Sequence, residues 1–252
     1  MLRGLYTAAT NMQLQRRKVD VIANNIANMD TTGFKADTLL SNSFADMLLS
    51  RVNDPSNAGN APVIGSLNTG VYPDDIATNF EEGSLKQTDR SADLAINGNA
   101  FFAVSTKAGE RYTRDGNFVV DSQGYLATSD GDRVAGTNGF LRVGNVNFTV
   151  DAQGNVKDEK GAAVGALRLV SFADTAGLKK AGNNLFMNES NQAAAAAQGS
   201  AVMQGYLEAS NTDITTEMLN MMSASRMFET SQRVVKMIDE TLGRAVNDIG
   251  KV

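Results

Sequence analysis

The sequence predicts an α+β fold: heptad helices at the two ends of the chain pair with each other, and a central antiparallel β domain with a duplicated hairpin lies between them. Three observations predict this fold. Apolar residues recur every seven positions near both ends of the 252-residue chain. The middle alternates apolar and polar residues between turns rich in Gly and Asn. One stretch of the middle recurs thirty residues later.

The N-terminal segment predicts a helix because Pro is absent from Leu2 to Asn28 and Gly4 is the only Gly there. Its apolar stripe consists of Leu5, Met12, Val19 and Ile26, with Ile22 at a companion position. Gln15 stands where the companion positions call for an apolar residue, so the stripe is imperfect. We expect residues 1–32 to form an N-terminal helix whose stripe faces another helix.

The C-terminal segment, residues 211–252, predicts a longer and more regular helix. Its stripe consists of Ile214, Met221, Phe228, Val235, Leu242 and Ile249, with Met218 beside it, and small residues fill the companion positions. Side-chain oxygens at Asn211 and Asp213 are suited to cap the first turn. The methionines of this segment have two possible roles. They either fill the core with adaptable side chains or form a seam that accommodates partner helices.

Two interpretations of the stripes remain open at this point. Each helix could simply cover the core of its own domain, as most amphipathic helices do. The strict seven-residue period and its presence at both ends favour a left-handed helix pair that also packs against neighbouring chains.

The middle predicts a β domain over residues 89–190. The segment Asp93–Val104 has the pattern of a hairpin with Asn97-Gly98 at its turn. Residues 117–124 and 147–154 share Asn, Phe, Val, Asp, Gln and Gly at the same positions, which indicates a duplicated hairpin. Residues 33–88 hold all three prolines and have no helical period, so we expect an extended linker, and residues 191–210 form a second linker.

The composition excludes most catalytic chemistry. Without Cys and His the chain has no thiolate nucleophile, no Ser-His-Asp triad and no imidazole metal ligand. Carboxylates such as Asp121 and Asp132 lie in Gly-rich turn contexts, where Asp is a turn former. We therefore predict no catalytic, cofactor-binding or metal-binding residues. A net charge of −5 argues against a nucleic-acid surface, and neither a membrane-spanning run nor a cleavable signal peptide is predicted.

Residues 23–35 contain a motif at Asn24, Asn25, Ala27, Asn28, Thr31, Gly33, Phe34 and Lys35. This motif resembles the signature of bacterial flagellar basal-body rod and hook proteins. Residues 93–118 are similar to the β domain of that family, and residues 205–228 are similar to its C-terminal entry and helix. The resemblance spans nearly the whole chain in family order.

The resemblance implies a structural subunit of the rod, of the FlgG/FlgF type, that assembles helically into a torque-transmitting tube. Hook subunits carry an additional outer domain, so the length favours a rod protein, with a hook-type axial protein as the alternative. Further implications are self-association, contact with other rod and hook proteins, and export through the flagellar type III apparatus without a cleaved signal peptide. The rod crosses the periplasm or cell wall, and the terminal helices would form its axial core.

Two alternatives come from other functional classes. A β module that binds cell-wall glycan, dimerised by its terminal helices, would need a clustered aromatic face, which five Tyr and no Trp make hard to build. A carboxylate-based wall hydrolase would need one Asp or Glu whose loss stops turnover without impairing assembly.

Overall fold

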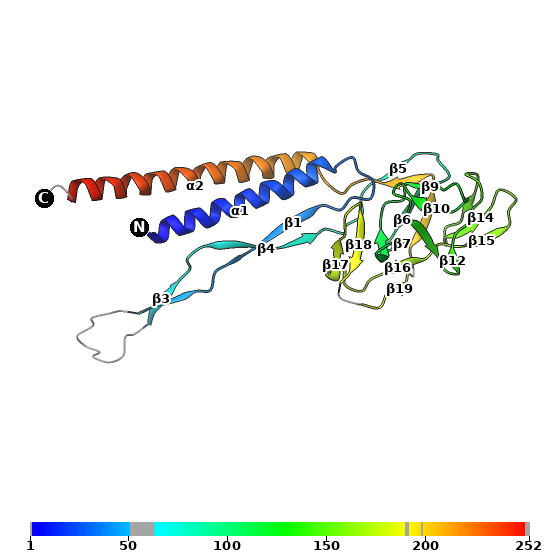
Figure 1. Cartoon of the computed structure of the whole chain (residues 1–252), viewed down its shortest axis with the longest axis horizontal. Coiled ribbons are helices and arrows are strands. Elements are labelled where there is room, and N and C mark those ends of the chain that lie inside the picture. The colour runs from blue at the N-terminus through cyan, green and yellow to red at the C-terminus, as the bar shows by residue number, and fades with distance from the viewer. Residues whose placement is uncertain (1, 51–62, 190–191, 198, 250–252) are drawn as a thin grey trace. The chain divides into compact units, whose positions relative to one another are not determined.

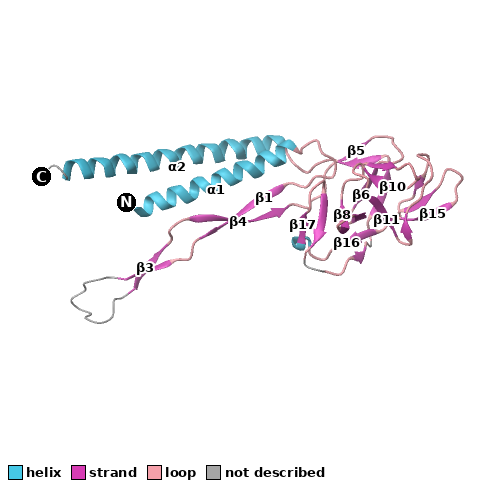
Figure 2. Cartoon of the chain, viewed as in Figure 1, coloured by secondary structure: helices cyan, strands magenta, loops and turns pink. Residues whose placement is uncertain are grey.

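The computed structural model describes residues 2–50, 63–189, 192–197 and 199–249, and it divides the chain into two compact units (Figures 1 and 2). The first, here called the helical unit, consists of Met1–Ile26, Asp37–Ala77 and Ile214–Val252. The second, the β unit, consists of Ala27–Ala36 and Thr78–Asp213. The chain therefore enters the β unit from the first helix, leaves it, returns to it, and ends in the second helix.

The helical unit contains α1 (Leu2–Ala27) and α2 (Ile214–Ile249), which run antiparallel side by side (Figure 1). Three residue pairs show the register of the two helices. A Cβ at Gly4 would lie 3.4 Å from Ile238 Cδ1, Asn11 Nδ2 donates to Ser231 Oγ at 2.8 Å, and Asn25 Nδ2 donates to Glu217 Oε1 at 3.1 Å. Each advance of seven or fourteen residues along α1 matches an equal return along α2, which is heptad geometry.

The same unit contains two paired ribbons in the segment expected to be a linker. Strand β1 (Asp37–Ser43) pairs with β4 (Val71–Thr78), and β2 (Met47–Ser50) pairs antiparallel with β3 (Val63–Leu67). The described part of the segment predicted as an extended linker, residues 33–88, thus contains paired strands, whereas Pro55 and Pro62 lie outside the described residues. Pro73 lies within β4 of a two-stranded ribbon, where its missing N–H can face away from the partner strand.

The β unit is built from short antiparallel strands. Its strands are β5 (Leu85–Gln87), β6 (Leu94–Asn97), β7 (Phe101–Thr106), β8 (Gly109–Thr113), β9 (Phe118–Val120), β10 (Leu126–Thr128), β11 (Arg133–Gly136), β12 (Gly139–Phe140), β13 (Thr149–Val150), β14 (Asn155–Lys157), β15 (Ala163–Ala166), β16 (Leu169–Ser171), β17 (Leu178–Lys180), β18 (Leu185–Asn188), β19 (Ala195–Ala196), β20 (Ala201–Gln204) and β21 (Tyr206–Glu208), with a 3₁₀ turn at Thr175–Gly177. The main sheet has the order β17-β18-β8-β7-β11-β10-β9. The helices at the chain ends and this antiparallel centre confirm the predicted α+β fold.

The β unit has two apolar clusters, and strand β7 contributes to both of them. Phe102 packs edge-to-face on Phe118 in the larger cluster, and both rings are fully buried. Phe101 on the opposite face of the strand packs against Phe172 and Phe186 in the smaller cluster. Because successive residues of a strand point to opposite faces, the Phe-Phe pair supplies one ring to each cluster.

The predicted duplication is confirmed as two three-stranded meanders, β9-β10-β11 and β13-β14-β15. In the first hairpin of each, an Asp side chain accepts bonds from backbone amides two and four residues ahead, at Asp121 and Asp151. The Tyr125 amide that bonds to Asp121, and the side chain and amide of Asn155 that bond to Asp151, hold the pKa of these two half-buried carboxyls below the usual range. Gly124 and Gly154 close the two turns with φ of 82° and 84°.

The hairpin predicted at Asn97-Gly98 does not form, and this prediction was wrong. Strand β6 pairs with β20, whereas β7 pairs with β8, β11 and β16. Residues 201–204, expected to belong to a linker, supply the partner of β6 from more than a hundred residues away. Tertiary pairing therefore overrides the local turn signal.

Candidate assembly site

The signature motif forms a turn that leads out of α1 and into the β unit. The Thr31 amide donates to the Asn28 carbonyl at 3.1 Å, and Gly33 has φ of +65°. A Cβ at Gly33 would lie 2.4 Å from the backbone nitrogen of Asp115. Only glycine fits this close approach and this φ, which gives the signature Gly a physical reason.

The turn brings three separate sequence motifs together. The Gly33 amide donates to the Glu208 carbonyl at 2.8 Å, and Thr32 Oγ1 donates to Asp115 Oδ1 at 2.7 Å. Glu208 belongs to the C-terminal entry segment and Asp115 to the Tyr-Thr-Arg-Asp-Gly motif. Burial raises the pKa of the Asp115 carboxyl, and the Thr32 hydroxyl opposes the rise by bonding to the ionised form.

Beside the turn lies a buried group of three charges. Lys35 Nζ lies 2.5 Å from Glu208 Oε1, Arg114 Nη1 lies 3.5 Å from Glu208 Oε2, and each of the three side chains is at most 1% exposed. Burial lowers the pKa of Lys35 and of Arg114, while the Glu208 carboxylate acts in the opposite direction on both. One carboxylate thus balances two buried cations, and its removal would leave both cations buried without a counter-charge.

Backbone groups also bond to Lys35 and Glu208. Lys35 Nζ also donates to the Glu81 carbonyl at 2.6 Å, and the Gly83 amide donates to Glu208 Oε1 at 3.0 Å. Arg114 stacks over the ring of Phe101 at 4.9 Å. The Lys of the signature is therefore a structural side chain, buried against the strand that leads to α2.

Asn211 ties the exit from the turn to the approach to α2. Its Oδ1 accepts from the Ala36 amide at 2.8 Å, and its Nδ2 donates to the carbonyls of Asn79 and Glu81. The Asn211 side chain does not cap α2 as predicted, because it bonds to two other backbone segments. This group and the buried charges hold both connections of the terminal helices at one place in the β unit.

Within the helical unit, Asn25 performs a similar task. Its Oδ1 accepts from the Asp37 amide at 2.9 Å and its Nδ2 donates to the Asp37 carbonyl at 2.8 Å, so it pairs with β1 as a neighbouring strand would. The same Nδ2 reaches Glu217 of α2. The second Asn of the signature therefore links α1, β1 and α2.

The helix seam contains a polar group where the stripe is interrupted. Gln15 is 6% exposed and donates to Asn11 Oδ1 at 3.1 Å, Asn11 donates to Ser231, and Ser231 Oγ donates to the Met227 carbonyl at 2.9 Å. Every buried polar group in this chain of bonds has a partner. Gln15, which interrupts the apolar stripe, therefore belongs to a hydrogen-bond network in which each polar side chain has a partner.

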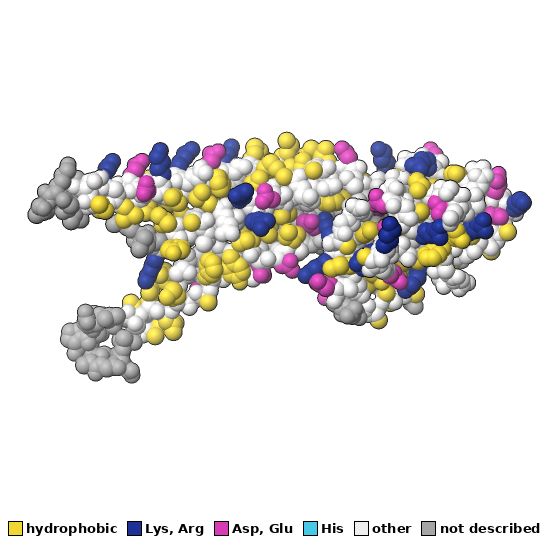
Figure 3. Space-filling view, in the orientation of Figure 1, with side chains coloured by type: hydrophobic (Ala, Val, Ile, Leu, Met, Phe, Trp, Pro, Cys, Tyr) yellow, Lys and Arg dark blue, Asp and Glu magenta, His cyan; other side chains and the backbone are white. Residues whose placement is uncertain are grey.

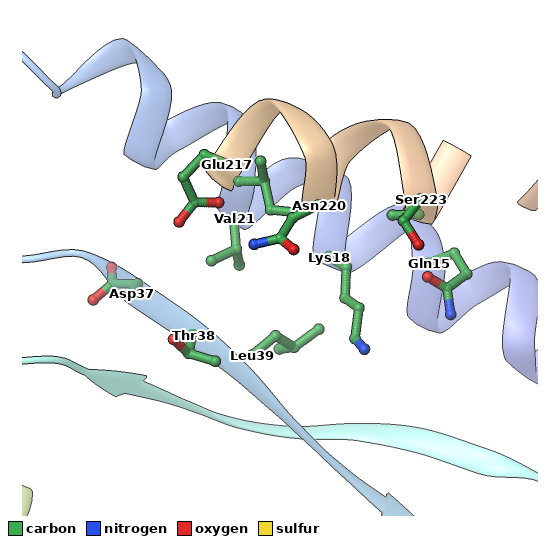
Figure 4. Close-up of a pocket in the computed structure, with 11 residues that line it drawn as sticks. Gln15, Lys18, Val21, Asp37, Thr38, Leu39, Glu217, Asn220 and Ser223 are labelled. Atoms are coloured by element: carbon green, nitrogen blue, oxygen red, sulfur yellow. The ribbon is translucent and has the colours of Figure 1, made fainter. Parts of the chain in front are cut away.

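Next to the seam lies a hollow of about 280 Å³ bounded by α1, α2 and β1 (Figure 4). Figure 4 shows Lys18 of α1 and Glu217 and Asn220 of α2 around it, with Asp37 and Leu39 of β1 opposite. The polar side chains that line this hollow come from both helices and from β1. No metal-binding cluster of three acidic side chains is found among the described residues.

The predicted seam residues occupy two kinds of position. Ile22 is buried, while Leu5, Met12, Val19, Ile26, Met221, Phe228, Val235 and Leu242 are half-buried. Ile214 and Met218 are exposed by 40% and 55%, and the side chain of Ile249 lies outside the described part. The small residues Ala8, Ala224 and Ser231, which stand at companion positions of the stripes, are buried. The intramolecular pair therefore uses the companion series and leaves much of the main series partly open.

The signature residues divide between the units. Asn24, Asn25 and the last residues of α1 end the helix, Asn28, Thr31 and Gly33 make the turn, and Phe34 and Lys35 are buried beyond it. Lys180 Nζ lies 4.0 Å from the Phe34 ring centroid. Glu208, the ion-pair partner of Lys35, and Arg114, which shares that carboxylate, were not predicted from the sequence. The available signal was that each lies in a family motif and carries a charge.

Comparison with protein families finds three matches along the chain. Residues 5–35 match the model "Flagella basal body rod protein". Residues 95–157 match "Flagellar hook protein FlgE/F/G D1 domain" and residues 203–248 match "Flagellar basal body rod FlgEFG protein C-terminal". The signature turn and the C-terminal entry lie within the first and last of these matches.

Full-length relatives have the same extent. The chain is 34% identical to the flagellar hook-basal body complex protein FlhO of Bacillus subtilis, with both chains covered completely. It is 34% identical to the basal-body rod protein FlgG of the same organism, over 98% of this chain and 99% of the relative. It is 36% identical to the basal-body rod protein FlgF of Caulobacter vibrioides over the whole of both chains. Among the described helices none is long and apolar enough to span a membrane.

Proposed function

The chain belongs to the family of flagellar basal-body rod proteins, as a structural subunit of the rod, and we propose that it assembles helically into a tube that transmits torque. Its partners are further copies of itself and the other rod and hook proteins. It reaches the basal body through the flagellar type III export apparatus, without a cleaved signal peptide, and lies where the rod crosses the periplasm or cell wall. Its role is mechanical and non-catalytic.

The observation that carries this proposal is the incomplete burial of the helical unit. Phe228, Val235 and Leu242 remain half-buried in the single chain, and Met218 is more than half exposed. Large apolar side chains of this kind mark interaction surfaces when they gather on one element. Neighbouring subunits that cover them would form a tube wall of helices buried on several sides. Dense packing of that kind resists deformation, as torque transmission requires.

The β unit supports the proposal through its fixed connections to both helices. The Lys35–Glu208 pair and the Asn211 bonds hold the end of the signature turn and the approach to α2 together. A load applied to either helix connection would therefore reach the same small region of the β unit. Buried, hydrogen-bonded charges specify one arrangement of such a region.

Incorporation into basal bodies tests the proposal. Phe228→Asp or Val235→Asp places a charge on the partly covered face of α2 and should abolish incorporation and motility. Circular dichroism of the purified variants should still show a folded β unit. Thr241→Asp, on an exposed position of the same helix, is the matched control and should be incorporated normally.

Survival of motility in both apolar variants would show that this face is not the assembly surface. Cryo-electron microscopy of intact basal bodies then gives the subunit's place. Density for the chain in the distal rod or next to it supports the proposal, whereas density in the hook favours the hook-type alternative.

A further inference from the structure

The outer face of α2 is apolar near the beginning of the helix and charged along the rest of it (Figure 3). Met218, Leu219 and Met222 are exposed by 55%, 58% and 50%. At about 100° per residue they lie on the side of the helix turned away from Ala224, which faces α1. Figure 3 shows this apolar region over the beginning of α2, with charged side chains along the rest of the helix. We call Met218, Leu219 and Met222 the α2 patch.

The α2 patch borders a shallow hollow of about 390 Å³. Leu219, Met222 and Met227 line it together with Ser223, Arg226 and Thr230. The exposed Arg226 forms no ion pair within the described part of the chain. The site therefore offers flexible apolar side chains around one available positive charge. Methionine-rich surfaces of this kind adapt their shape to an apolar partner.

The β2–β3 hairpin presents a second uncovered apolar surface. Met47, Leu48, Val63 and Ile64 are exposed by 58%, 72%, 58% and 64%. The cross-strand register pairs Met47 with Leu67 and Leu48 with Ser66, so the apolar residues lie on both faces of the ribbon. A two-stranded hairpin is marginally stable alone, and these four side chains stay largely uncovered by the rest of the described chain. Asp46 precedes it, exposed and without an ion pair among the described residues.

We propose that the β2–β3 hairpin of one copy packs on the α2 patch of a second copy. The two surfaces are different and belong to the same chain, so each copy can both give and receive the contact. Such a heterologous contact does not have to close, and its repetition builds a filament. Asp46 beside the hairpin and Arg226 in the hollow next to the patch carry opposite charges, which favours this pairing over patch on patch. The inference rests on the proposed function and identifies two of its contact surfaces.

Disulfide trapping tests the contact directly, because the chain contains no cysteine. Leu48→Cys and Met218→Cys are introduced together into the full-length chain, and isolated basal bodies are oxidised. We expect covalent multimers in which residue 48 of one copy is joined to residue 218 of another, identified by peptide mass spectrometry. Chains with either cysteine alone should stay monomeric. Links of 218 to 218, links within one copy, or links only to other rod proteins would each overturn the inference.

A charge exchange provides the second measurement. Leu48→Glu and Met218→Lys should each lower incorporation by about tenfold, which corresponds to roughly 1.4 kcal/mol of contact energy. The double variant should recover most of the loss, because the new charges face each other. Met237→Lys, 57% exposed on the same helix but outside the patch, is the control and should be incorporated normally.

The results separate this inference from the function on which it rests. If the unmodified chain is absent from basal bodies, the proposed function fails. If it is present but the paired cysteines give no 48–218 link and the double variant shows no recovery, the function stands and only the hairpin contact is refuted.

Discussion

The two units of this chain differ in how far each completes its own core. Among the described residues, the β unit holds 26 of the 30 buried hydrophobic side chains. The helical unit holds 4 of these, but it carries 16 of the 20 large hydrophobic side chains that remain exposed. The β unit therefore buries a complete core of its own. The helical unit exposes apolar side chains of the kind that mark an interaction surface.

The difference follows from shape. Two helices and thin ribbons have too little interior to bury both sides of their apolar residues. Strands β6–β18, in contrast, enclose two clusters in which Phe102, Phe118 and Phe101 are almost fully buried. Variants in the β unit should thus change the stability of the free chain, and variants in the helical unit should change assembly.

The largest expected effect on free-chain stability comes from Glu208→Ala. Loss of this carboxylate leaves Lys35 and Arg114 buried without their counter-charge, so we expect a loss of about 3–5 kcal/mol in the free energy of unfolding. Urea unfolding followed by circular dichroism measures it. The control is Glu189→Ala, because Glu189 pairs with Lys179 at the surface, where such pairs contribute about 0–1 kcal/mol. Equal losses in the two variants would show that the buried charges do not stabilise the β unit.

A smaller effect should appear in the pH dependence of the same unit. The folded pKa of Asp115 is raised above its ordinary 3.8, so the folded chain retains this proton more readily than the unfolded chain. The resulting stabilisation is complete below the unfolded pKa and disappears as the pH rises through the folded pKa. Asp115→Asn should keep the acceptor for Thr32 and flatten the fall in stability across this window.

Unfolding at a series of pH values on the acid side of neutrality measures this slope. Asp89→Asn, at an exposed position of the same unit, should leave the slope unchanged. An unaltered slope in Asp115→Asn would mean that other carboxyls cause the pH dependence.

The sequence was sufficient to predict the elements whose signal is periodic. The seven-residue series predicted both helices and their pairing, because a heptad stripe requires a partner. Glycines with positive φ at Gly124 and Gly154 allowed the duplicated turns to be recognised. The family signature contains Gly33, whose positive φ makes the turn after α1 in the same way.

Long-range pairings were not predictable in the same way. The sequence around Asn97-Gly98 predicts that β6 forms one strand of a hairpin. Its partner is instead β20, which no residue near this turn indicates. Lys35 and Glu208 are 173 positions apart, and a lone Lys after a helix usually stays in solvent. Gln15 was seen as a flaw in the stripe because its partners Asn11 and Ser231 become neighbours only after the helices pair.

Hydrogen–deuterium exchange tests most directly whether the β unit is self-sufficient and the helical unit depends on partners. The dilute free chain and the chain in isolated basal bodies are labelled and compared peptide by peptide. We predict that peptides within residues 94–188 are protected equally in both states, and that α2 peptides spanning Met218–Val246 exchange rapidly in the free chain and become protected on assembly. Equal protection of α2 in both states would contradict the account.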